Sequence, residues 1–121
     1  HTRYIGDWSS DVCSSDLSSG RENAYLHGNP REPGPYIYAT RWPAHSKALA
    51  HYHPDSRYCV VLQGVHYIGY GEKYDEAKLN RHEAGTWFTE PAKQGHFGLT
   101  KDEGAVLLFY GMGPSRLDPL E

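Results

Sequence analysis

Short runs of β-branched and aromatic residues recur along most of the chain and predict strands. These runs are 36–42, 47–53, 57–62, 65–70, 86–89, 96–100 and 105–110. Turn residues separate them at intervals of roughly 8 to 12 residues, as in barrels and sandwiches. Gln63 and Gly64 predict a hairpin turn, and the polar stretch 72–81 is the only one with helical character. We therefore predict an all-β fold, a closed or sandwiched antiparallel barrel.

The two ends of the chain lack this pattern. Residues 18–35 are rich in Gly, Pro and charge, which predicts an N-terminal arm rather than a packed element. Residues 36–112 then form the barrel, and residues 113–121 form a C-terminal tail. A length of 121 residues allows one domain. No apolar run is long enough to span a bilayer, so we expect no membrane partner.

The first seventeen residues, HTRYIGDWSSDVCSSDL, show neither periodicity nor a core face. Their end back-translates to TGG-AGT-TCA-GAC-GTG-TGC-TCT-TCC-GAT-CT, which resembles a common adaptor used in short-read DNA sequencing. We interpret residues 1–17 as a translated artefact from an assembled metagenome, outside the fold; a natural Ser/Asp-rich tail is the alternative. This interpretation excludes Cys13 as a disulfide partner for Cys59. The natural N-terminus is not visible, so localisation stays unknown, with secretion expected if the substrate is a polysaccharide.

Charge and composition narrow the function. The net charge of −3 excludes the strongly basic face that nucleic acid requires. Eight His in so short a chain are many, and His is the commonest metal ligand.

Three of these His have a spacing that suits a metal site. Residues i and i+2 of a strand face the same side, so Leu49, His51 and His53 are predicted to share a face. A third ligand must come from another strand. His96 supplies it directly after the turn 91–95.

The surrounding residues resemble the two motifs of the cupin family. The first motif runs Gly, five residues, His-x-His, three or four residues, Glu, six residues, Gly; the second runs Gly, five residues, Pro-x-Gly, two residues, His, three residues, Asn. Matching positions are His51, His53 and Gly64, then Gly85, Pro91 and His96. The departures are His45 and Lys93 in place of Gly, Thr100 in place of Asn, and Arg57 in place of the Glu ligand.

This resemblance implies a single-domain cupin jelly-roll β-barrel, a homodimer, and one divalent transition metal held by His51, His53 and His96. Arg57 cannot ligate a metal because it stays protonated. Three neutral imidazoles favour Cu first, with Fe, Zn, Ni or Mn as alternatives. Because some cupins keep the shell without a metal, the His residues can also be read as core residues.

Cupins include dioxygenases, isomerases and small-ligand sensors. We expect a metal-dependent oxidoreductase that uses oxygen or peroxide. By analogy with compact mono-copper cupins, oxidative cleavage of cellulose or a related polysaccharide comes first, with exposed aromatics as the substrate track. A three-His iron-type dioxygenase acting on a small organic molecule is close behind. A metal-dependent isomerase or lyase and a non-catalytic small-ligand-binding module come after these two.

Two further residues are catalytic candidates. Arg57 is expected to orient the substrate or to pair with Glu90 or Asp55. Tyr110 is expected to serve as an outer ligand or redox partner, although packing explains it as well. Cys59 is expected to be a small core residue. Outside residues 1–17, surface or loop positions are expected for the other histidines, His27, His45, His66 and His82.

Overall fold

The computed structural model describes residues 12–16 and 20–121, and these residues are almost entirely β-structure. The strands are β1 (Val12–Asp16), β2 (Arg21–His27), β3 (Gly34–Trp42), β4 (Lys47–Tyr52), β5 (Arg57–Tyr70), β6 (Asn80–Glu83), β7 (Trp87–Glu90), β8 (His96–Leu99), β9 (Ala105–Gly113) and β10 (Asp118–Pro119). Within these described residues the only helical segment is the 3-10 turn η1 (Glu76–Lys78). The predicted all-β fold is confirmed.

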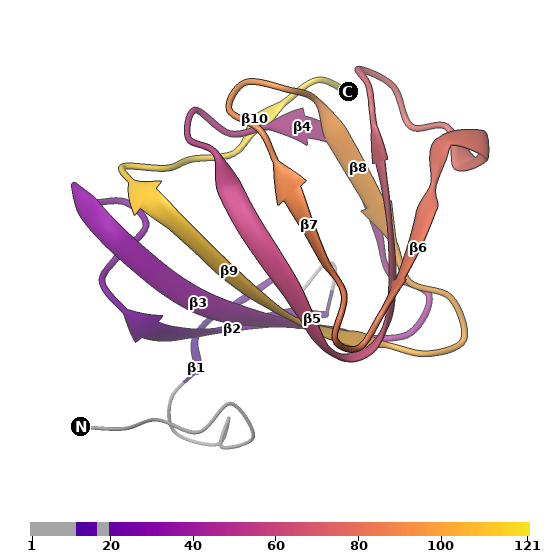
Figure 1. The fold of residues 1–121 in the computed structure, drawn as a ribbon, viewed down its shortest axis with the longest axis horizontal. Helices are drawn as coiled ribbons and strands as arrows, with labels where there is room; N and C mark the ends of the chain where they lie inside the picture. Colours follow the sequence, from indigo (N-terminus) through magenta and orange to yellow (C-terminus); the bar gives the residue numbers. More distant parts are fainter. Residues whose placement is uncertain (1–11, 17–19) are drawn as a thin grey trace.

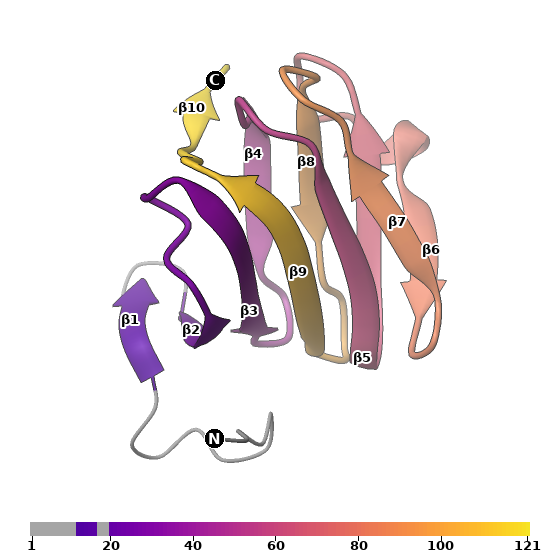
Figure 2. The ribbon, with the colours of Figure 1, turned by 60° about the vertical axis from the view of Figure 1, so that its left-hand side comes forward.

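Two curled antiparallel sheets share β5 and wrap around one interior (Figures 1 and 2). The first half of β5 lies between β9 and β7, in a sheet that continues through β3 and β2 to β1. The second half lies between β8 and β6, in a sheet that continues through β4 to β10. The chain therefore forms a half-barrel whose concave side holds the core.

The predicted hairpin turn at residues 63–64 is wrong, because β5 runs unbroken through it. Gly64 has a φ of +75°, and a Cβ placed there would lie 1.8 Å from the carbonyl oxygen of Gly104. At this point the strand moves from one sheet to the other instead of reversing. Val61 and Ile68, on either side of the bend, are both fully buried.

Three segments for which we did not predict strands contain them. In the predicted arm, β2 pairs with β3 and buries Ala24. The predicted helical stretch is η1 followed by β6. The tail returns as β10 along β4. Of the segment interpreted as an artefact, residues 1–11 and 17 lie outside the described residues, while residues 12–16 pair with β2 as β1. That interpretation stays a prediction.

The core lies between the two sheets. Val61, Leu107 and Phe109 from one sheet face Ile68 from the other. Cys59 belongs to the same cluster as a free, buried thiol, and its burial raises its pKa. It is the core residue that we expected. Among the described residues, no helix is long and apolar enough to cross a membrane.

Gly64→Ala should destabilise the fold by roughly 3 kcal/mol or more, because it combines a left-handed backbone with a backbone clash. Gly85→Ala is the matched control, since Gly85 has a φ of +90° but open space around its Cβ position. The control should cost only about 1–2 kcal/mol. Urea unfolding of both variants measures the difference, and equal losses would contradict the role given to the close approach at Gly104.

Candidate metal centre

A bulge in β4 sets the direction of His51. Ala48 lies opposite Gly98 and His51 opposite His96, so β4 uses one residue more than β8 between the two pairs. The predicted alternation is therefore wrong for Leu49, which is 51 % exposed, while Ala48 lines the interior. The extra residue shifts the phase of the strand, and this brings His51 to face the interior beside His96.

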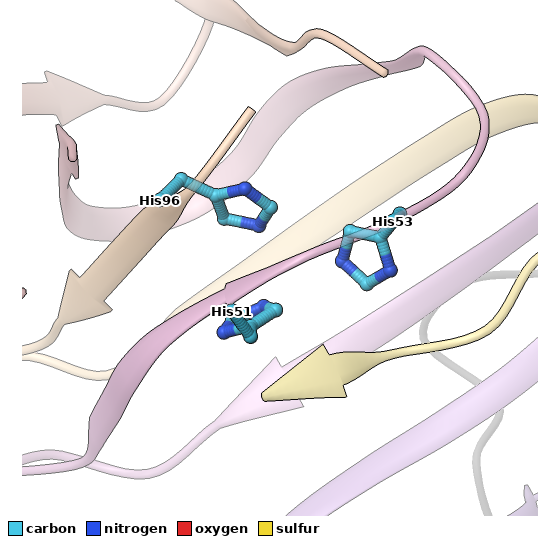
Figure 3. Close-up of side chains that lie close together, drawn as sticks. All are labelled: His51, His53 and His96. Carbon is cyan, nitrogen blue, oxygen red and sulfur yellow. The ribbon is translucent and has the colours of Figure 1, made fainter. Parts of the chain in front are cut away.

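The three predicted ligands come together at one point, as Figure 3 shows. His51 is on β4, His53 is the first residue after the end of β4, and His96 is the first residue of β8. One ring nitrogen from each lies within 4.8 Å of the other two. The ring centroids are 4.4 Å apart for His51 and His96, and 5.1 Å apart for the other two pairs. We call these three residues the three-His centre.

Backbone carbonyls fix the tautomer of each imidazole. The Nδ1 atoms of His51, His53 and His96 lie 2.7, 2.8 and 3.3 Å from the carbonyl oxygens of Leu49, Arg116 and Gln94. A carbonyl only accepts, so each Nδ1 carries the proton and each Nε2 keeps its lone pair. This is the arrangement by which metal-ligating His residues are usually oriented.

The free Nε2 atoms fit a metal ion. Those of His53 and His96 are buried and have no hydrogen-bond partner among the described residues, a state that is costly unless a ligand satisfies it. Burial lowers the pKa of His51 and of His53 to about 4 and also lowers the pKa of His96. The rings are therefore neutral near pH 7 and able to donate their lone pairs.

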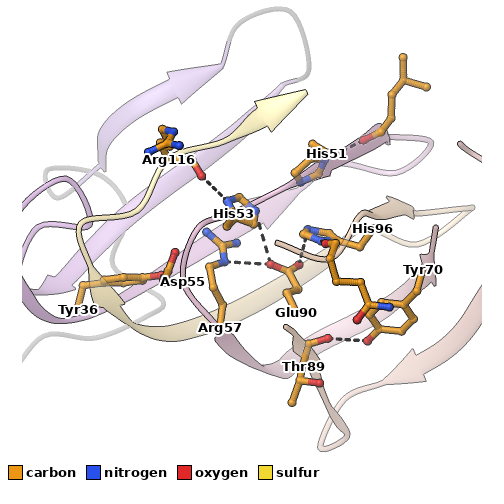
Figure 4. A network of polar contacts seen from close by, with 12 residues as sticks. Tyr36, His51, His53, Asp55, Arg57, Tyr70, Thr89, Glu90, His96 and Arg116 are labelled. Atoms are coloured by element: carbon orange, nitrogen blue, oxygen red, sulfur yellow. Dashed lines mark hydrogen bonds and ion pairs between the residues drawn. The ribbon is translucent and has the colours of Figure 1, made fainter. Parts of the chain in front are cut away.

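Glu90, which the sequence suggested only as a partner of Arg57, brings a carboxylate to the centre. It lies opposite Arg57, on β7, and its Oε1 accepts a hydrogen bond from Arg57 Nε at 2.9 Å (Figure 4). Its Oε2 lies 3.3 Å from His96 Nε2, and its Oε1 lies 3.7 Å from His53 Nε2. Burial is the largest single effect and raises the pKa of Glu90, but the Arg57 guanidinium and the three histidines together outweigh it, and the pKa falls to about 2. An ionised carboxylate thus stands beside the three imidazoles.

The two predicted catalytic residues have different positions. Arg57 is 7 % exposed and lines the cavity, with its guanidinium carbon 4.3 Å from the centroid of the Phe109 ring. The expectation for Tyr110 is wrong, because it is 46 % exposed on the outer face beside Tyr58. Successive residues of a strand face opposite sides, so Phe109 takes the inward position.

A cavity of about 390 Å³ extends from the three-His centre into the barrel. Among its lining residues is His66, for which a surface or loop position was expected and which is 3 % exposed instead. The two tryptophans among the described residues differ in exposure. Trp42 is buried in the core, whereas Trp87 is 69 % exposed on the outer face.

Comparison with known proteins identifies the fold. No protein-family model and no curated protein matches the sequence, but solved structures do. An RmlC-like cupin from Shewanella frigidimarina is 14 % identical over 92 % of each chain, with a TM-score of 0.69. The polyketide cyclase RemF from Streptomyces resistomycificus is 12 % identical over 84 % of this chain and 71 % of that one, with a TM-score of 0.71.

A third structure is a salicylate 1,2-dioxygenase variant from Pseudoaminobacter salicylatoxidans. It is 13 % identical over 86 % of this chain and 32 % of its own, with a TM-score of 0.66. These likenesses at low identity show that the chain folds as a cupin domain, a jelly-roll β-structure. The predicted cupin jelly-roll fold is confirmed.

Alanine in place of His51, His53 or His96 should each remove most of the bound metal, because each substitution deletes one of the three converging lone pairs. His82→Ala is the control, since His82 lies on β6 away from the centre. Elemental analysis after loading with copper, iron, zinc or manganese gives the metal content per chain. Equal retention by all four variants would show that the centre has been misassigned.

Proposed function

We propose that this chain is a mononuclear metal-dependent enzyme that converts a small organic molecule inside the barrel. The observation that carries the proposal is the convergence of three lone pairs whose imidazoles are held by backbone carbonyls. A carboxylate lies beside them, and a cavity of about 390 Å³ adjoins them. Cavities of about 300–1,000 Å³ are typical of sites for small ligands.

His51, His53 and His96 would hold the metal, with Glu90 close enough to serve as a further ligand. A bound transition metal would supply open positions for oxygen or substrate, and copper has first place on intrinsic affinity, with iron next for its oxygen chemistry. Arg57 keeps Glu90 ionised and fixes its direction through their hydrogen bond. The apolar side chains of the cavity wall, such as Phe97 and Leu107, would pack against the apolar part of a substrate.

Oxygen-dependent oxidation is the reaction class that we propose first. An isomerase or lyase needs a group that takes a proton from the substrate. Among the described residues that line the cavity, Glu90 is the only carboxylate, and its Oε1 is already bonded to Arg57. Lewis-acid chemistry therefore comes second. The dioxygenase and the cyclase with this fold are in line with both classes.

A small molecule suits this cavity better than cellulose. Two of the three imidazoles, those of His53 and His96, are buried. Of the tryptophans that could contribute to a polysaccharide track, Trp42 is buried in the core and Trp87 is exposed on the outer face. Polysaccharide oxidation is thus the weaker alternative, and an iron- or copper-dependent oxygenase for a small substrate is the stronger one.

Oxygen uptake by the metal-loaded protein tests the reaction class. The copper or iron form should consume oxygen in the presence of a small aromatic or aliphatic substrate, and the zinc form should not, because zinc has no redox chemistry. His96→Ala, loaded in parallel, is the inactive control. Turnover with zinc and without oxygen would point instead to an isomerase or lyase. Metal binding without any turnover would point to a ligand-binding module.

We further propose a homodimer, formed through the outer face of the sheet that contains β7, β5 and β9. Its exposed apolar side chains lie on adjacent strands: Val60 lies opposite Trp87, and Tyr58 opposite Tyr110. A contiguous apolar patch of this kind typically marks an interface in soluble proteins. A second copy of the chain would cover it with the same residues, as two-fold symmetry requires.

Light scattering coupled to size exclusion measures the oligomeric state. The unmodified chain should elute as a dimer, and Val60→Lys should elute as a folded monomer, because a charge at the centre of the patch opposes its burial. Lys73→Glu, in an exposed loop, should leave the dimer intact. A monomeric unmodified protein would overturn this proposal.

A further inference from the structure

His66 is a second polar residue of the cavity, distinct from the three-His centre. It lies on the second half of β5 and is 3 % exposed. Neither of its ring nitrogens has a hydrogen-bond partner among residues 12–16 and 20–121. Since buried polar atoms are nearly always satisfied in native proteins, an unpartnered imidazole in a cavity wall indicates a site for a ligand.

Aromatic neighbours hold the His66 ring in one orientation. It stacks on Phe88 with an interplanar angle of 10° and meets the edge of Trp42 at a centroid distance of 4.7 Å. The guanidinium of Arg21 lies 4.4 Å from the centroid of a Trp42 ring, and its positive charge favours an oxygen atom nearby. Burial lowers the pKa of His66 to about 4, so the ring is neutral near pH 7.

Small residues form the part of the cavity wall that adjoins His66. A Cβ placed at Gly98 would lie 3.0 Å from His66 Nε2, so the imidazole sits directly over this glycine. Ala48 lies opposite Gly98 on β4, and both line the cavity. Gly98 is two residues after His96, so these two residues are separated by about 7 Å along β8.

Apolar side chains, among them Ile68, Phe97, Leu107 and Phe109, form part of the cavity wall. Polar side chains that include Thr40 and Arg57 line the same cavity. A ligand with an apolar body and polar groups at its ends is compatible with this mixed lining.

We propose that His66 is a substrate-binding residue that hydrogen-bonds an oxygen-bearing group at the far end of the substrate. The reacting end would lie at the three-His centre, and in this respect the inference rests on the proposed function. A neutral imidazole has one donor and one acceptor nitrogen. A hydroxyl group, which both donates and accepts, matches either one. The substrate class is thus a small organic molecule with an apolar middle and a distal hydroxyl.

Two nearly isosteric probes test this assignment: 4-hydroxybenzoate carries the hydroxyl, and 4-methylbenzoate has a methyl group in its place. Calorimetry with the zinc-loaded and the metal-free protein gives both affinities. The hydroxyl compound should bind on the order of tenfold more tightly to the unmodified protein, as one buried hydrogen bond allows. In His66→Leu the preference should vanish.

Two further variants keep the test clear of folding defects. His66→Gln retains a donor and an acceptor and should keep part of the preference. His82→Leu should keep all of it: His82 contacts the same Phe88 ring but is not among the cavity-lining residues. In the unmodified protein, the side-chain nitrogen signals of His66 should shift when 4-hydroxybenzoate is added.

The outcomes separate this inference from the proposed function. Equal binding of the two probes, a preference that survives in His66→Leu, or binding of neither probe would overturn the role of His66. Failure of the three-His centre to take up metal would overturn the proposed function instead. The metal-free measurements remain decisive for His66 in that case, because they do not depend on a bound ion.

Discussion

The buried ion pair between Arg57 and Glu90 is the interaction on which the centre of this barrel depends. Each group alone would be a strongly unfavourable charge in the interior, so neither is tolerated without the other. Their pairing joins β5 to β7 at the point where both strands reach the cavity. It also directs the second carboxylate oxygen toward His96. One contact therefore accounts for an arginine inside a β-barrel and for a carboxylate beside the imidazoles.

The three-His centre relies on backbone atoms in a comparable way. Three separate segments supply the backbone carbonyls of Leu49, Gln94 and Arg116. Each carbonyl oxygen accepts a hydrogen bond from the Nδ1–H of one imidazole. The C-terminal segment thus contributes directly to the centre, because Arg116 precedes β10 and β10 pairs with β4. The bulge in β4 completes the arrangement by placing His51 opposite His96. Side-chain direction here depends on main-chain geometry more than on neighbouring side chains.

The cavity lining combines apolar side chains, such as Ile68 and Leu107, with polar ones such as Arg57 and His66. Under the proposed role of His66, one end of the ligand must suit the three-His centre and Glu90, and the other end must suit a neutral imidazole. Such a site would select small molecules by length and by the position of an oxygen atom. A specific hydrogen bond is a stronger discriminator than apolar contact, because a mismatched ligand leaves a buried polar group unsatisfied.

The sequence by itself determined the all-β fold, the cupin resemblance and the three histidines, because strand periodicity and motif spacing are local properties of the chain. The sequence also showed Arg57 at the motif position of the Glu ligand. Because an arginine side chain stays protonated and has no lone pair to donate, it could be excluded as a metal ligand from the sequence alone. The tertiary structure decided the rest. Glu90 lies beside the three imidazoles because its cross-strand partner Arg57 holds it there. Tyr110 does not face the centre as we expected, because the alternation of side chains along β9 turns it to the outer face. His66 is buried only because β5 continues past Gly64 into the second sheet. Cross-strand register, bulges and sheet crossings arise from pairing between distant segments, and a local pattern carries no information about them.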